Sequence, residues 1–354
     1  MAVAMTIAPR KLDPRARSSL RAPAFLKPRL SIVIVNYCQW RNTRLLTKQL
    51  QKSRVARSGV SEIVIIDNHS PSHCSPNAIR QREGVKVRRL LRNHGFARAA
   101  NEGCRLSSGG WYLLLNPDVT VEPRFLDRVD KLVRTTRHDP RLGIIGIGIK
   151  NTDGSPQPSC GPLPTLSSTL TGLFLPRAQR RCKQIDTETR APVSWATGCA
   201  LLIRKECWRD IGGFDEDYFL YYEDVDLCRR ATEHGWNVCY EPQIAVAHHS
   251  PLHTRHLSPL MRLVTRHALL TYSLKHWSRW QSLVLGGLMW LESGLRESVA
   301  WSRDQQQEKK IYQKIRRLIT STLQNHGVMA RRIIRETAEQ LACEAISRDG
   351  LYTE

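Results

Sequence analysis

Two short apolar runs decide the fold, LSIVIVNY at 30–37 and EIVIIDNH at 62–69, and each of them ends in polar residues. Both runs are apolar almost throughout, which is typical of strands that helices cover on both faces. A helical pattern separates them at residues 41–52. The order strand, helix, strand predicts a parallel sheet with crossover helices.

The alternation continues after the second run. It predicts strands at 85–91, 111–115 and 143–149, and helices at 96–106 and 123–135. These elements and the first two strands together form an α/β half that is typical of nucleotide-binding proteins.

Residues 151–192 are rich in Pro, Gly, Ser and Thr, so we expect a long surface connection there. Regular elements resume after it. They are predicted strands at 196–204, 238–241 and 244–247, and predicted helices at 205–211 and 223–234, the second of which Gly235 ends.

The chain therefore divides into three parts: a flexible basic arm at 1–29, an α/β domain at 30–250 and a helical region at 251–354. The predicted helices of the last part cover 257–277, 279–299 and 305–346. The middle helix combines Trp and Leu residues with Arg279 and Arg296. This pattern fits a membrane interface or a helix that packs on the α/β domain, and the sequence leaves both open.

Composition excludes fibrous and disordered proteins, because 41% of the 354 residues are apolar and 24% are charged. The net charge of +22 favours an anionic partner, which could be nucleic acid, a membrane surface or a phosphorylated small molecule. The ten cysteines are scattered without a C-x-x-C pair, so we expect free thiols in a reducing compartment. Basic residues interrupt the N-terminus, and no apolar stretch is long enough to span a bilayer.

Polar residues follow two of the predicted strands directly. Asp67 and Asn68 come after the second strand, and Asn116-Pro117-Asp118 after the fourth. Ligands of open α/β sheets bind at the carboxyl ends of the strands, so these loops should converge on one crevice. Asp118 there is a natural ligand for Mg²⁺ or Mn²⁺, which neutralises a nucleoside diphosphate. The alternative for each Asp is a turn or a helix N-cap.

A third polar group packs six carboxylates and four aromatic side chains into residues 215–226, just before a helix. The aromatic residues suggest a lined pocket with carboxylates at its floor. Such a carboxylate can take a proton from an attacking hydroxyl. Acids in the first turn of a helix also stabilise that helix, and both interpretations can hold at once.

Six short motifs follow one another along the chain: 30–37, 63–70, NHGFA at 93–97 with Asn101, LLLNPD at 113–118, TGCALLI at 197–203, and GGFD at 212–215 with YEDVDL at 222–227. In this order they resemble the family 2 inverting glycosyltransferases, specifically the bacterial rhamnosyltransferase-like branch. The resemblance covers roughly residues 30–250. It implies a GT-A type fold, which is a mixed, mainly parallel sheet flanked by helices, here with a helical C-terminal extension.

The resemblance also implies roles for individual residues. Asp224 would be the catalytic base, with Glu223 shaping the acceptor site. Asp118 takes the place of the last Asp of the family's D-x-D metal motif, while Asn116 stands at its first position, so the metal site has one strong carboxylate. His248 matches a family histidine near the diphosphate or metal, and His249 is its alternative. The donor-binding residues would be Asn36, Asp67, Asn93, Gly95, Asn101, Asn116 and Asp118, with Asp67 facing the nucleotide base.

The expected reaction is inverting transfer of a sugar from a nucleotide-sugar donor to a glycan or polyprenyl-diphosphate-linked acceptor, with Mg²⁺ or Mn²⁺. Branch similarity favours dTDP-rhamnose over UDP-hexoses as the donor. The expected location is cytoplasmic, peripheral on the inner face of the plasma membrane, where the basic arm and the middle C-terminal helix would meet anionic lipid. The assignment requires that the loop ending at 118 and the turn at 223–224 face one cavity.

Two rival functions differ from this expectation. A basic protein that binds nucleic acid without catalysis would fit the charge, but no nucleic-acid module is recognisable, so we expect no nucleic-acid partner. A nucleotidyltransferase would need a Gly-rich phosphate loop after the first strand, and NYCQ at 36–39 contains no glycine.

Overall fold

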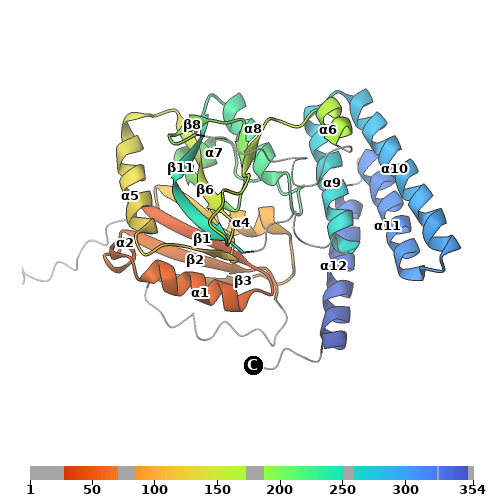
Figure 1. The fold of residues 1–354 in the computed structure, drawn as a ribbon, viewed down its shortest axis with the longest axis horizontal. Coiled ribbons are helices and arrows are strands. Elements are labelled where there is room, and N and C mark those ends of the chain that lie inside the picture. Colours follow the sequence, from red (N-terminus) through yellow and green to blue (C-terminus); the bar gives the residue numbers. More distant parts are fainter. Residues whose placement is uncertain (1–27, 71–83, 173–186, 250–258, 325–326, 350–354) are drawn as a thin grey trace, which may run out of the picture.

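A computed structural model describes residues 28–70, 84–172, 187–249, 259–324 and 327–349. The predicted basic arm at 1–29 therefore lies almost wholly outside the described residues. Figure 1 shows a sheet with helices on both sides and a separate group of helices at one end.

The described residues contain a nine-stranded mixed sheet in the order β3-β2-β1-β4-β10-β6-β11-β5, with β8 paired to β11. β1, β2, β3 and β4 are mutually parallel, as are β6 and β11, whereas β10 runs antiparallel to both of its neighbours, β4 and β6. The strands are β1 (Leu30–Asn36), β2 (Ser61–Asp67), β3 (Val85–Arg89), β4 (Trp111–Leu115), β5 (Val119–Thr120), β6 (Leu142–Lys150), β8 (Ala191–Pro192), β10 (Ala200–Arg204) and β11 (Asn237–His248).

Two apolar cores lie on the two faces of this sheet, because successive side chains of a strand point to opposite faces. In β1, Ile32 and Ile34 join one core, and Val33 and Val35 join the other. The first core is covered by α1 (Trp40–Gln51), α2 (Arg54–Arg57) and α5 (Phe125–Thr135), and the second by α4 (Phe96–Leu106), α7 (Lys205–Asp210) and α8 (Glu223–Glu233). The predicted burial of both faces is confirmed.

Three expectations for individual elements are wrong. The predicted strand at 196–204 is split into β9 (Trp195–Ala196), which pairs with β7 (Cys160–Gly161), and β10. The two predicted strands at 238–247 are one strand, β11, with an irregularity between Glu241 and Ala245. Pro242 lies in that irregularity, and a proline cannot donate to the ladder, which explains why a break was expected.

The predicted helix at 305–346 is two helices, α11 (Gln306–Leu323) and α12 (Gly327–Asp349). The break precedes Gly327, and glycine has a low helix propensity. The connection at 151–192 is also more ordered than expected, because it contains β7, α6 (Leu166–Gly172) and β8; its residues 173–186 lie outside the described residues.

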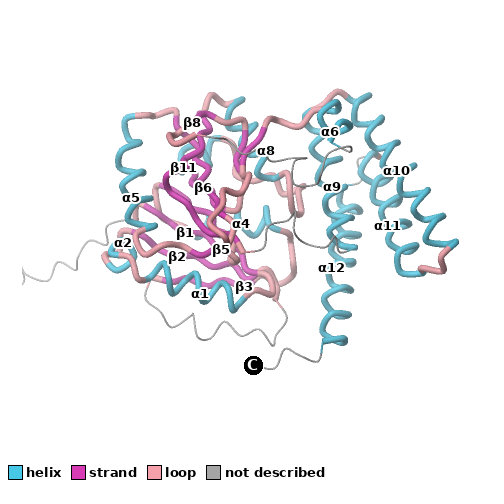
Figure 2. Tube along the Cα trace, viewed as in Figure 1, coloured by secondary structure: helices cyan, strands magenta, loops and turns pink. Residues whose placement is uncertain are grey.

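The C-terminal helices α9 (Pro259–His276), α10 (Arg279–Ser302), α11 and α12 form a third apolar core. α9 lies on the side of this group that faces the sheet, whereas α10 and α11 lie farther out (Figure 2). Phe219, from the loop before α8, belongs to this third core, so the loop joins the two parts of the molecule. None of the helices among the described residues is both long and apolar enough to cross a membrane.

Candidate active site

The ends of β1 and β2 bring Asn36 and Asp67 together. The two residues are register partners, and the Asn36 amide donates to the Asp67 carboxylate at 3.1 Å. Thr43 Oγ1 of α1 donates to Asn36 Oδ1 at 2.8 Å, which fixes the orientation of the amide. The other Asp67 oxygen lies 3.6 Å from Nε of Arg89 on β3. Asp67 is therefore held by two neighbouring strands at the sheet edge where it was expected.

Asn68 connects this edge to the predicted donor residues Asn93 and Gly95. Its amide donates to Asn93 Oδ1 at 2.8 Å and to the Gly95 carbonyl at 3.0 Å. Gly95 has a φ of +84°, and a Cβ there would lie 2.2 Å from the Phe219 carbonyl oxygen. The next residue, Phe96, donates its N–H to that same carbonyl at 2.6 Å. Glycine is thus required where this loop meets the loop before α8.

Asp118 lies beside His248 because β5, which follows Asp118 directly, pairs with the end of β11. The Asp118 carboxylate is 5% exposed and lies 3.4 Å from His248 Nε2. The amide of Gln157 lies 3.3 Å from Nδ1 of the same ring. His249 is oriented differently, since its Nε2 lies 3.1 Å from Thr120 Oγ1. Of the two histidines, the structure brings the ring of His248 to the predicted metal ligand.

These two side chains fit a divalent cation. Carboxylate oxygen and imidazole nitrogen are ligands that Mn²⁺ accepts, and a Mg²⁺ or Mn²⁺ ion in a nucleotide site takes its other ligands from phosphate and water. In the described part of the chain, no cluster of three or more His, Cys, Asp or Glu side chains could hold a metal ion. Asp118 and His248 would be the protein ligands of such an ion, with the neutral side chain of Asn116 at the first motif position.

Asp224 lies in the first turn of α8 and is 5% exposed. Its Oδ2 accepts a hydrogen bond from the Gly198 N–H at 3.1 Å. Tyr221 and Tyr222, directly before α8, have φ values of +71° and +65°. Positive φ is unfavourable for bulky residues and persists only where the surroundings impose it. The chain thus enters α8 through a strained turn that sets the direction of Glu223 and Asp224.

The turn Thr197–Cys199 between β9 and β10 connects the two loops. The Cys199 carbonyl accepts from the Asn116 N–H at 2.9 Å, and the neighbouring Gly198 donates to Asp224. The loop that contains Asp118 and the turn that contains Asp224 are therefore anchored on adjacent residues, Cys199 and Gly198. Sequence reasoning gave this turn no role, although a glycine between two predicted strand residues was a usable signal. The cavity that both loops should face stays a prediction.

The name acidic loop is used here for residues 214–226, which comprise the loop before α8 and the first turn of that helix. Several of its carboxylates pair with basic side chains of other elements. Lys275 of α9 pairs with Asp215 at 2.7 Å and with Asp217 at 2.8 Å, and Arg331 of α12 also pairs with Asp217. Asp226 accepts from His276 at 2.7 Å and from Arg230 at 2.7 Å. Burial alone would raise the pKa of Asp226, but the His276 and Arg230 interactions outweigh it and lower that pKa.

Asn101 lies on α4 and faces the acidic loop. Its Nδ2 donates to the Phe214 carbonyl at 2.9 Å, and its Oδ1 accepts from the Phe214 N–H at 2.9 Å. The side chain thus holds the start of the loop against α4. Its predicted contact with the donor stays a prediction.

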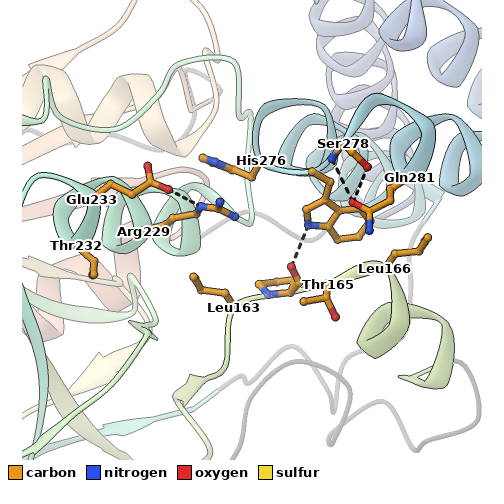
Figure 3. Close-up of a pocket in the computed structure, with 11 residues that line it drawn as sticks. Leu163, Thr165, Leu166, Arg229, Thr232, Glu233, His276, Ser278 and Gln281 are labelled. Atoms are coloured by element: carbon orange, nitrogen blue, oxygen red, sulfur yellow. Dashed lines mark hydrogen bonds and ion pairs between the residues drawn. The ribbon is translucent and has the colours of Figure 1, made fainter.

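A cavity of about 400 Å³ lies beside α8, where the C-terminal helices meet the β7–α6 connection. Figure 3 shows Arg229 and Glu233 of α8 on one side and Ser278 and Gln281 on the other. Trp277 closes it by donating its indole N–H to the Pro164 carbonyl at 3.0 Å. His276 lines this cavity and contacts Asp226, so the cavity wall adjoins the acidic loop.

Comparison with known proteins identifies the family of this chain. The profile of the family described as "Glycosyltransferase like family 2" matches residues 28–280. An N-acetylglucosaminyl-diphospho-decaprenol L-rhamnosyltransferase of Mycobacterium tuberculosis is 30% identical over 67% of this chain and 85% of its own length. The low-salt glycan biosynthesis hexosyltransferase Agl10 of Haloferax volcanii is 28% identical over 63% of this chain and 68% of its own length.

Among solved structures, a mannosyltransferase of Pyrobaculum calidifontis in complex with GDP-Man and Mn²⁺ is 13% identical, covers 86% of each chain and superposes with a TM-score of 0.48. The family profile spans the whole α/β part and the start of the helical region. The chain therefore belongs to glycosyltransferase family 2, in its rhamnosyltransferase-like branch, and is a glycosyltransferase of the GT-A fold.

Proposed function

We propose that this glycosyltransferase moves rhamnose from dTDP-rhamnose to a hydroxyl of a lipid-linked glycan in bacterial cell-surface polysaccharide synthesis, with inversion at the anomeric carbon. The name of the M. tuberculosis relative supports both the sugar and a polyprenyl-diphosphate acceptor. A UDP-hexose is the second candidate donor, because the H. volcanii relative is named only as a hexosyltransferase.

The proposal depends on one observation: Asp224 and the Asp118 loop are both hydrogen-bonded to the turn Thr197–Cys199. A proton acceptor and a metal-ligating carboxylate held on the same turn are the two groups that this reaction needs. The hydrogen bond from the Gly198 N–H holds the Asp224 carboxylate, and the two tyrosines before α8 have strained, positive φ values.

In the proposed reaction, the acceptor oxygen attacks the anomeric carbon from the face opposite the diphosphate. The bond from that carbon to the phosphate oxygen breaks, and the nucleoside diphosphate leaves with the electron pair. Asp224 takes the proton of the attacking hydroxyl, which requires a hydrogen-bond distance between the two oxygens. Glu223, on the same turn of α8, shapes the acceptor site.

Asp118 and His248 would hold the divalent cation, Mg²⁺ or Mn²⁺. When bound, it neutralises charge on the diphosphate. Asn116 contributes a neutral amide beside it. At the strand ends, Asp67 and Asn93 would bind the nucleoside, with Asn36 orienting Asp67 through its hydrogen bond.

The experiment is a screen of the purified protein against nucleotide sugars with Mg²⁺ and Mn²⁺. The proposal expects dTDP-rhamnose with metal to raise the melting temperature most, and to yield dTDP when a lipid-linked N-acetylglucosamine acceptor is added. Stabilisation and turnover with a UDP-hexose alone would establish the second candidate. Stabilisation by no nucleotide sugar would contradict both.

We also propose that the enzyme works in the cytoplasm, peripherally on the inner face of the plasma membrane. A polyprenyl-linked acceptor lies in that bilayer, and the net charge of +22 favours its anionic surface.

A further inference from the structure

The outer face of α10 is apolar along its whole length. Nine of the fourteen large apolar side chains that are exposed among the described residues belong to this one helix, and each of the nine is at least 38% exposed: Trp280, Leu283, Val284, Leu288, Trp290, Leu291, Leu295, Val299 and Trp301. Most of them are three or four positions apart, which places them on one side of a helix. With 24 residues, the helix extends about 36 Å.

The two acidic side chains of α10 lie at the borders of that face, and both are paired with arginines. Glu292 pairs with Arg266 of α9 at 2.6 Å, and Glu297 pairs with Arg316 of α11 at 3.1 Å. Both acids thus serve the packing of α10 on its neighbours. The inner side of α10 is closed by α9 and α11, and the apolar face looks outward.

Basic side chains border the apolar face. Arg279 is exposed at the start of the helix and Arg303 at its end, while Arg296 is exposed along one flank. On the other flank, Arg316 lies over the ring of Trp290 at 3.9 Å. Trp290, Arg317 and the ion pair of Arg316 with Glu297 line a groove of about 670 Å³ between α10, α11 and α12.

We propose that this face of α10 lies in the surface of an anionic lipid bilayer, with its apolar side chains among the acyl chains and its arginines at the phosphate groups. Three tryptophans along the face fit this occupant, because indole rings prefer the boundary between headgroups and acyl chains. An uncharged strip whose borders carry more basic than acidic side chains is typical of helices that lie in the membrane plane. Arg317, which is exposed at this groove, is then placed to contact a lipid phosphate.

A second copy of the chain fits this face less well. A symmetric dimer brings the same patch of both copies together. The exposed arginines at the two ends of α10 would then face arginines of the other copy, and each copy carries a net charge of +22. An anionic bilayer instead offers opposite charge to the exposed arginines at the ends of the strip, Arg279 and Arg303.

This surface deepens the proposed membrane location and rests on that part of the proposed function. The test is flotation of the full chain with vesicles of phosphatidylglycerol and phosphatidylcholine, with pure phosphatidylcholine vesicles for comparison. The proposal expects the chain to float with the anionic vesicles and more weakly with the neutral ones. Leu295→Glu should lower the partition coefficient at least about tenfold, because it puts a charge into the apolar strip.

Leu45→Glu is the matched control, since Leu45 is an exposed leucine on α1, away from α10. It should float like the wild type. Leu283→Ser is a second variant from the other end of the strip and should weaken binding in the same direction. Melting temperatures near that of the wild type would establish that the variants are folded.

Three results would overturn the proposal: a wild-type chain that stays unbound with both vesicle types, folded Leu295→Glu and Leu283→Ser variants that float like the wild type, or a dimer that Leu295→Glu turns into a monomer without any vesicle binding. Transfer to a water-soluble acceptor is measured separately. If that transfer persists in Leu295→Glu while binding is lost, the surface and the reaction are both supported. If the wild type transfers no sugar but floats with the vesicles, the proposed reaction is contradicted and the proposed membrane surface is supported.

Discussion

The two sides of the site are held in different ways. On the strand-end side, Asn36, Asp67, Asn68, Asn93 and Gly95 are linked by hydrogen bonds between residues of the α/β part itself. On the other side, much of the acidic loop is held from outside, by Lys275, His276 and Arg331 of the C-terminal helices. The C-terminal helices are therefore a structural component of the side that contains the acidic loop, and the two sides should respond differently to mutation, salt and pH.

The largest expected effect tests whether the acidic loop carries the base. Asp224→Asn keeps the shape and the hydrogen bond from Gly198 but cannot take a proton at neutral pH. We expect kcat to fall by about 10²–10⁴-fold with donor affinity nearly unchanged, as measured by steady-state transfer and by donor binding. Glu216→Gln, from the same loop, is the control and should keep most of the activity. If Asp224→Asn kept a turnover near that of the wild type, Asp224 would not be the catalytic base.

The next effect belongs to the strand-end side. Asp118→Asn removes the carboxylate beside His248, and we expect kcat/KM to fall on the order of 10²-fold, because a divalent ion contributes several kcal/mol to stabilising charge. Titration with Mn²⁺ should then show weaker activation. Glu122→Gln, an exposed acid a few residues away, is the control. If Mn²⁺ activated Asp118→Asn as strongly as the wild type, Asp118 would not be a metal ligand.

A third variant breaks the contact between the two sides. Gly95→Ala places a methyl group 2.2 Å from the Phe219 carbonyl oxygen at a positive φ. We expect the free energy of unfolding to fall by about 1–3 kcal/mol, and both donor and acceptor kinetics to worsen. Gly59→Ala, which is also at positive φ but meets no atom within 4 Å, separates the backbone cost from the clash. Equal melting temperatures for both variants would contradict the close contact.

A smaller effect on kcat is expected when a contact between the C-terminal helices and the acidic loop is removed. His276→Leu leaves buried Asp226 with one hydrogen-bond donor fewer, and such a loss costs about 1–3 kcal/mol. We expect kcat to fall about tenfold while donor affinity is kept. His276→Gln retains an N–H donor and should restore part of the rate. If His276→Leu weakened donor binding instead, the C-terminal helices would serve the strand-end side.

The smallest effect is a pH dependence of stability. Burial, followed by the positive charge of Arg331, lowers the pKa of His267 on α9 from 6.5 to about 4. Between these values the unfolded chain binds more protons than the folded one, so the free energy of unfolding should fall as the pH drops. The lowered pKa values of Asp217 and Asp226 act in the same direction.

Urea unfolding at a series of pH values would measure this slope. His267→Gln should flatten it, whereas His138→Gln, at an exposed histidine of the α/β part, should not. A slope that is the same in both variants would mean that the docking of α9 is not acid-sensitive.

Sequence predicted the strand-end half of the fold closely. The helix at 96–106 and the strand at 111–115 have the expected bounds, because continuous apolar runs and helical spacing are local signals. The break before Gly327 was missed, since a single glycine does not distinguish a weak helical position from a helix end. The antiparallel direction of β10 depends on long-range pairing, which no local pattern encodes.

For the candidate site, sequence identified residues but not their supports. Asp118 and His248 lie 130 positions apart, and only the pairing of β5 with β11 brings them together. The roles of Lys275 and His276 were missed because their carboxylate partners were all interpreted as pocket residues. Asn101 was predicted to bind the donor, whereas its amide hydrogen-bonds the Phe214 backbone and the Glu216 carboxylate.

The position of β10 constrains the order in which the chain can fold during synthesis. β4 ends at Leu115, but β10, which pairs with it, starts only at Ala200. β6 also pairs with β10, although it is synthesised earlier. At ribosomal rates on the order of 5–20 residues per second, the open edges of both strands would be exposed for several seconds. Unpaired strand edges readily recruit other chains. Truncations that end before residue 200 should therefore aggregate rather than yield a smaller folded domain.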